Sequence, residues 1–134
     1  MSNPVSSLLP TALLWVGLGG AIGAMLRYLV VGLASQAGLI FPLGTLLVNV
    51  IGSVVMGIFA GFLVLHTDIT HEGKLFFQTG LLGAFTTFSA FSLDTLLLWQ
   101  QGLWRIALAS VLLNVVLCLA AVVIGFTMAT VFTK

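Results

Sequence analysis

Residues 79–94 read TGLLGAFTTFSAFSLD, and they combine small, hydroxyl-bearing and aromatic residues inside a chain that is otherwise mostly apolar. Two glycines come first, and hydroxyl residues follow them at Thr86, Thr87 and Ser89. Glycine weakens a helix, and hydroxyl groups bond to backbone groups that leave the helical ladder. The stretch therefore predicts local unwinding near positions 83–87. Backbone that is not helical is tolerated at membrane depth only where protein buries it or where it lines a cavity, and its carbonyl groups would suit a cation.

The composition around this stretch is that of a membrane protein. The chain has 134 residues, of which 60% are hydrophobic and 5% charged, and its mean hydropathy is +1.28. A soluble domain carries roughly 25% charged residues. Forty consecutive uncharged residues separate Arg27 from Asp68, and one spanning helix needs about 20 apolar residues. These features predict an all-α integral membrane protein.

Four transmembrane helices fit the chain best, as a single domain over residues 1–134. We expect the spans at about 11–34, 42–65, 75–101 and 103–132, with an aqueous loop at 66–74. No Lys or Arg precedes Trp15, so the first span lacks the basic region of a cleaved signal and we expect it to be retained. Aromatic residues near the span ends suit interfacial anchors: Trp15, Tyr28, Trp99 and Trp104.

The few charges bear on orientation and on partners. An even number of spans places both termini with the 66–74 loop, so Lys74 and Lys134 lie on one side and Arg27 and Arg105 on the other. Because basic residues set orientation, this balance gives no bias: it permits insertion in both directions and hence an antiparallel dimer, and the alternative is that a subtler signal sets one orientation. Four helices packed around their own axis fill their centre with side chains, so a path for a solute would need a second copy. With a net charge of +1 and no basic cluster, we expect no nucleic-acid partner.

Nothing in the sequence predicts an enzyme. There is no phosphate-binding glycine loop, no metal-ligand spacing and no Ser-His-Asp arrangement. Both histidines, His66 and His71, lie in the predicted loop and are five residues apart, so they do not share a helical face.

Polar residues within the spans need partners. An unpaired amide in hydrocarbon costs several kcal/mol, so Asn49 and Asn114 must face another helix or a wet cavity. Either amide could bond between helices, worth about 0.6 to 2 kcal/mol, or donate its N–H groups to a permeating anion. Arg27 could extend to the interface or pair with Asp94, and the sequence leaves both choices open.

Three phenylalanines recur every three residues: Phe85, Phe88 and Phe91. On a continuous helix they would form a stripe that packs or contacts lipid. The alternative uses the aromatic ring edge, which is electropositive and can receive an anion without carrying net charge. Weak neutral donors in series suit conduction, which requires entry without trapping.

Three segments together resemble the Fluc/CrcB family of fluoride channels. They are GGAIGAMLRY at 19–28, GTLLVNVIGS at 44–53 and GLLGAFTTFSAFSLD at 80–94. The resemblance covers nearly the whole chain. It implies a fluoride-selective channel in the plasma (inner) membrane that exports fluoride passively. It also implies an antiparallel, dual-topology homodimer with two pores and a break in the third helix.

The resemblance also assigns roles to residues. It implies a fluoride pore lined by Asn49, Thr87, Phe88, Ser89, Phe91 and Asn114, with Arg27 near the vestibule. Backbone oxygens of Gly83 and Thr86 would hold a structural Na+ at the dimer centre. Four positions depart from the commoner family pattern: Ala84, Phe85, Ala90 and Asp94.

Two other readings remain open. A small proton-coupled multidrug exporter also has four spans, but it needs a deep acid, and Asp94 is the one candidate. A non-transporting membrane subunit would use its glycine-rich faces only to pack against a partner. Halide flux separates these readings from a fluoride channel.

Overall fold

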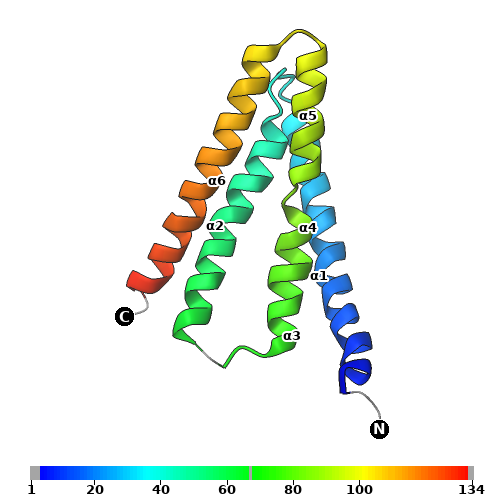
Figure 1. Ribbon diagram of the computed structural model, residues 1–134, viewed down its shortest axis with the longest axis vertical. Helices are drawn as coiled ribbons and strands as arrows, with labels where there is room; N and C mark the ends of the chain where they lie inside the picture. The colour runs from blue at the N-terminus through cyan, green and yellow to red at the C-terminus, as the bar shows by residue number, and fades with distance from the viewer. Residues whose placement is uncertain (1–3, 67, 133–134) are drawn as a thin grey trace.

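The structure, a computed structural model, describes residues 4–66 and 68–132, with side chains described from Pro10 onward. All regular structure in those residues is helical (Figure 1). The α-helices are α1 (Pro4–Ser35), α2 (Leu43–Leu65), α3 (His71–Lys74), α4 (Gly83–Phe85), α5 (Phe88–Gln100) and α6 (Trp104–Phe132). Between α3 and α4 lies the π-helix η1 (Leu75–Leu82). Four helical segments in this part of the chain are long and apolar enough to cross a membrane, namely Pro10–Ser35, Leu43–Leu65, His71–Gln100 and Trp104–Phe132.

The chain crosses the bundle four times in alternating directions, so the N-terminal end of α1, the C-terminal end of α6 and the loop after α2 lie at the same end of the molecule (Figure 1). At the opposite end, the turn before α6 contains Gly102 with φ +78°. Glycine adopts this left-handed conformation without the clash that a Cβ would cause. The turn is therefore short enough to place α5 and α6 side by side.

The boundaries differ from the predicted ones at three places. α1 continues through Pro10 to Pro4 instead of beginning near residue 11. Pro42 lies just before α2 instead of in its first turn. The predicted loop at 66–74 is also too long, because a helix begins at His71. There Thr70 Oγ1 accepts a hydrogen bond from the Gly73 N–H at 3.1 Å and caps α3.

Glycine allows close approach between helices in both halves of the bundle. A Cβ on Gly57 would lie 2.9 Å from Phe126 N, and one on Gly125 would lie 3.0 Å from Ile58 N, so α2 and α6 pack with their backbones in contact. α1 and η1 meet in the same way, since a Cβ on Gly80 would lie 2.7 Å from Val16 O. Small residues permit such contacts between membrane helices.

The outer surface of the bundle carries many exposed apolar side chains. Long side chains project from every long helix, among them Leu33, Val64, Leu96, Leu119 and Phe132. Monomeric soluble proteins rarely expose contiguous apolar patches of this extent, whereas a lipid bilayer solvates them. The tryptophans Trp15, Trp99 and Trp104, together with Tyr28, are also exposed, as interfacial anchors are.

Candidate functional site

The third span is helical except at two residues. α4 ends at Phe85, Thr86 is extended with φ −82° and ψ 157°, and Thr87 is extended with φ −152° and ψ 116°. α5 then begins at Phe88. We call residues 86–87 the interruption. Gly83, within the predicted region of unwinding, is itself helical with φ −63° and ψ −34°.

Both threonine hydroxyls satisfy backbone groups at the interruption. Thr86 Oγ1 donates to the Leu82 carbonyl at 3.0 Å. Thr87 Oγ1 accepts from the Ala90 N–H at 3.1 Å and so caps the first turn of α5. A capping hydroxyl of this kind stabilises a helix by about 1 kcal/mol. Thr86 and Thr87 therefore end α4 and start α5.

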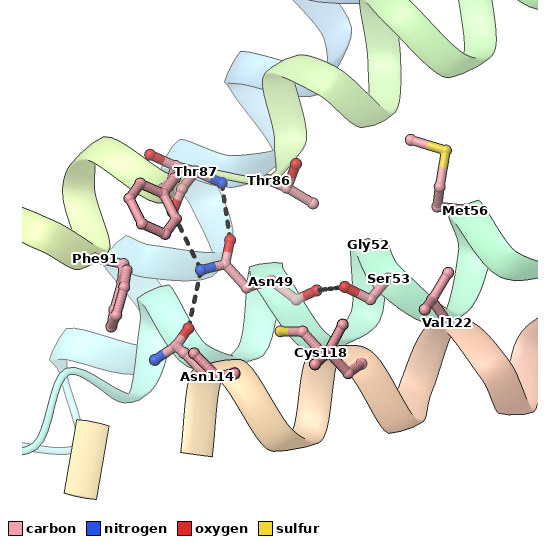
Figure 2. A pocket seen from close by; sticks show the side chains of 13 residues that line it. Asn49, Gly52, Ser53, Met56, Thr86, Thr87, Phe91, Asn114, Cys118 and Val122 are labelled. Atoms are coloured by element: carbon pink, nitrogen blue, oxygen red, sulfur yellow. Dashed lines mark hydrogen bonds between the residues drawn. The ribbon is translucent and has the colours of Figure 1, made fainter. Parts of the chain in front are cut away.

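Asn49 of α2 holds the interruption from the side (Figure 2). Its Oδ1 accepts from the Thr87 N–H at 2.8 Å, and its Nδ2 donates to the Thr87 carbonyl at 3.1 Å. Nδ2 also donates to Oδ1 of Asn114 on α6 at 3.0 Å. Asn114 Nδ2 in turn donates to the Ser110 carbonyl at 3.0 Å. Both Nδ2 hydrogens of Asn49 thus have acceptors within the single chain.

These bonds remove the helical donors of two carbonyl groups. In an unbroken helix, the Thr87 N–H would bond to the Gly83 carbonyl, but here it donates to Asn49. The Ala90 N–H would bond to the Thr86 carbonyl, but here it donates to the Thr87 hydroxyl. These are the carbonyls of the residues that the resemblance assigns to Na+. The Ala84 and Phe85 carbonyls lose their helical donors as well, because α5 begins only at Phe88.

A cavity of about 460 Å³ lies beside the interruption, between α2, α5 and α6. Figure 2 shows the paired amides together, with Met56 and Val122 farther along the cavity. Its walls are mostly apolar. It is lined by Asn49, Gly52, Ser53, Met56, Thr86, Thr87, Phe88, Phe91, Asn114, Val115, Cys118, Leu119 and Val122.

The two phenylalanines in this lining differ in exposure. Phe88 is 78% exposed and Phe91 is 7% exposed. Their ring centroids are 5.3 Å apart with the planes inclined at 66°, an edge-to-face arrangement. Phe85 is buried on α4, on the other side of the interruption, so the three rings do not form one continuous helical stripe.

Three predicted site residues lie outside the cavity lining. Ser89 is exposed, with its hydroxyl oxygen 3.3 Å from Thr87 Oγ1. Gly83 is exposed at the start of α4, and Arg27 is half-buried on α1. Among the described residues there is no Arg27–Asp94 hydrogen bond. Instead, Asp94 Oδ2 accepts from Thr45 Oγ1 at 2.6 Å.

The sequence reasoning missed two contributors to this region. Thr45, one helical turn before Asn49, provides the hydroxyl for Asp94. Gly52 faces the interruption, where a Cβ would collide with the methyl group of Thr86. Spacing along α2 places Thr45, Asn49 and Gly52 on one face, and that pattern was the signal available in the sequence.

Comparison with known proteins identifies the family of the chain. Residues 14–126 match the family described as CrcB-like protein, Camphor Resistance (CrcB). A protein of Shewanella denitrificans named fluoride-specific ion channel FluC is 55% identical over 117 residues, which cover 86% of this chain and 93% of that one. Proteins with the same name from Shewanella frigidimarina and Saccharophagus degradans are 52% identical over 117 residues and 45% identical over 127 residues. The first covers 86% of this chain and 93% of the relative, and the second 93% and 92%.

The family match extends over most of the chain, and the names of these relatives describe ion channels and not enzymes. The described part of the chain also has four helical segments that are long and apolar enough to cross a membrane. The chain therefore belongs to the CrcB-like (Camphor Resistance, CrcB) family and is a multi-pass membrane protein.

Proposed function

We propose that the protein is a fluoride-selective ion channel that exports fluoride passively across the plasma (inner) membrane. The observation that carries this proposal is the near full-length identity of 45–55% to relatives named fluoride-specific ion channels. The cavity beside the interruption supports it, because polar amides and aromatic edges meet there between apolar walls.

The chemistry of the cavity suits a small anion. Moving a bare ion into low dielectric costs on the order of tens of kcal/mol, so a path must replace hydration with many partial positive charges. Among the described residues, no Lys or Arg lines the cavity, and a fixed cation there would hold fluoride too strongly for release. The ring edges of Phe88 and Phe91, the Thr87 hydroxyl and the Asn114 amide line the cavity and are neutral, weak partners. The Ser89 hydroxyl lies outside the lining, 3.3 Å from Thr87 Oγ1, and is a further neutral partner of the same kind. The first turn of α5 adds unbonded N–H groups and the positive end of a helix dipole.

The assembly we propose is an antiparallel, dual-topology homodimer with two pores. Phe88 lines the cavity and is nevertheless 78% exposed in the single chain. A second copy packed on this face would cover the ring and close the cavity. The balanced basic residues support insertion in both directions, and Arg27 would lie near a vestibule.

A structural Na+ at the dimer centre fits the residues at the interruption. The Gly83 and Thr86 carbonyls have lost their helical donors, and neutral carbonyl oxygens are suitable cation ligands in a membrane. Gly83 is exposed, so two copies could bring these oxygens together. When bound, the ion would supply positive charge that ties the two interruptions together.

Halide flux from liposomes tests the function. Purified protein reconstituted into vesicles loaded with fluoride should release it electrogenically, and the same vesicles loaded with chloride should retain it. Equal flux of both halides would contradict fluoride selectivity. Proton-coupled uptake of an organic cation would instead indicate a multidrug exporter, and no flux of any kind would indicate a non-transporting subunit.

A further inference from the structure

The hydrogen bonds around the interruption form one relay that runs from α6 through α2 to the third span (Figure 2). It begins at the Ser110 carbonyl, passes through the amides of Asn114 and Asn49, and ends on the peptide groups of Thr87. Each of the four bonds is between 2.8 and 3.1 Å long. Three helices are thereby tied together through two side chains.

The direction of the relay is determined at both ends by backbone groups. The Ser110 carbonyl can only accept and the Thr87 N–H can only donate, whereas a side-chain amide can present either its oxygen or its nitrogen. If Asn114 were flipped, its NH2 would face the NH2 of Asn49, and its oxygen would face the Ser110 carbonyl. One orientation of the two amides therefore satisfies all four bonds: Thr87 fixes that of Asn49, Ser110 fixes that of Asn114, and the bond between the two amides joins them.

We infer that Asn114 is a positioning residue that acts through Asn49 to keep Thr87 in its extended conformation. With its Oδ1 engaged by Asn49 Nδ2, Asn114 leaves Asn49 Oδ1 free to take the Thr87 N–H. That bond withholds the Thr87 N–H from the Gly83 carbonyl. A side chain on the fourth span thus determines whether the carbonyl proposed for the cation is available. The relevance of this relay to conduction rests on the fluoride-channel function proposed above, but the relay itself does not.

The relay also changes what Asn49 contributes. Its Nδ2 carries two hydrogens, and both have acceptors in the chain, the Thr87 carbonyl and Asn114 Oδ1. Asn49 has no further N–H to offer an anion while the relay is intact. Although Asn49 lines the cavity, its side chain therefore serves to hold the interruption in place through hydrogen bonds to Thr87.

Hydrogen exchange at the Thr87 amide measures the relay without reference to ion flux. The experiment uses the full-length chain in detergent or lipid, with exchange resolved to single residues. Replacing Asn114 with leucine keeps the branching at Cγ and removes both hydrogen bonds of the side-chain amide. In Asn114→Leu, exchange at Thr87 should accelerate at least about tenfold relative to the native chain, because the amide opens more often, while amides of α2 two turns away should keep their rates.

Ser110→Ala is the matched control. The Ser110 side chain is fully buried on the same face of α6, and its hydroxyl has no partner among the described residues. The substitution leaves the backbone carbonyl that anchors the relay. Exchange at Thr87 should be unchanged in this variant.

Asn114→Asp separates positioning from packing. It retains an oxygen that can accept from Asn49 Nδ2 and loses the donor to the Ser110 carbonyl, so exchange at Thr87 should accelerate less than in Asn114→Leu. It also places an acid at the cavity, so fluoride flux should fall. A general loss of structure would accelerate exchange in this variant as much as in Asn114→Leu, whereas the relay predicts a smaller acceleration of exchange together with a fall in fluoride flux.

Native exchange at Thr87 in folded Asn114→Leu protein would overturn the inference. If that variant does not fold, Asn114→Val removes the same bonds with less volume and carries the same expectation. Absence of fluoride flux in the native chain would contradict the proposed function. The exchange rates would then still decide whether Asn114 positions the interruption.

Discussion

Thr45 on α2 and Asp94 on α5 are joined by a 2.6 Å hydrogen bond from the threonine hydroxyl to the carboxylate Oδ2. Thr45 is buried and Asp94 is half-buried. Acids within membrane spans usually pair or face water, and here the partner is a neutral hydroxyl on a neighbouring helix. The bond ties α5 to α2 one helical turn before Asn49, which holds the interruption.

Thr45→Val should destabilise the folded chain, because it removes the donor and leaves the carboxylate with one fewer partner. A hydrogen bond to a charged group is worth about 1.5–3 kcal/mol, and the loss should appear as a lower free energy of unfolding in mixed detergent. Thr127→Val is the matched control, since that hydroxyl bonds only to the Val123 carbonyl of its own helix. Equal stability of the two variants would show that the Thr45–Asp94 bond contributes nothing.

Gly23→Ala should disrupt the packing of α1 on η1. A Cβ at this position would lie 2.9 Å from the carbonyl carbon of Leu81, a backbone atom that cannot move aside, so the expected loss of stability is about 1–3 kcal/mol. Gly20→Ala, three residues earlier, meets nothing within 4 Å and should be neutral or stabilising by up to about 1 kcal/mol. Thermal unfolding in detergent compares the two, and a stable Gly23→Ala chain would contradict the packing described for α1.

Phe88→Ile should sharply reduce fluoride flux while leaving the fold and the dimer intact. The ring lines the cavity, and isoleucine loses its electropositive edge but remains a large apolar side chain that the second copy can cover. Phe132→Ile is the control, because that ring is 83% exposed at the far end of α6. Flux assays in liposomes measure both, and native flux through Phe88→Ile would remove this ring from the proposed pore.

A tag joined after Lys134 should be found on both sides of the membrane. This residue lies outside the described part of the chain, but the prediction depends only on the balance of basic residues. Accessibility of the tag to an impermeant protease, in intact and in opened vesicles, provides the measurement. Complete protection or complete cleavage in intact vesicles would show a single orientation and contradict the antiparallel dimer.

Sodium should stabilise the purified protein if the Gly83 and Thr86 carbonyls bind it. A ligand that binds only the folded state at 100 times its Kd adds about 2.7 kcal/mol, so the melting temperature should rise with Na+. A large organic cation at the same ionic strength should have no such effect, because it cannot fit among carbonyl oxygens. Identical melting in the two salts would exclude the proposed cation site.

Some features could be predicted because they depend on local composition alone. The number of spans follows from the length of each apolar run, and the family resemblance is confirmed by the match over residues 14–126. The start of α3 at His71 was missed, because its Thr70 cap lies among charged residues that are typical of a loop. The role of Gly52 was missed because a glycine among other glycines gives no sign of which neighbour it meets.

The sequence by itself determined that this chain is a four-span membrane protein, and that Asn49, Asn114 and Asp94 must each find a partner, because hydrocarbon offers none. Only the tertiary structure decided which partners they find. Asn49 bonds to Thr87, 38 residues away, and to Asn114, 65 residues away, while Asp94 bonds to Thr45 and not to Arg27. The physical reason is that a hydrogen bond depends on a few tenths of an ångström. Those distances are set by the rotation and register of packed helices, which no local pattern of residues encodes.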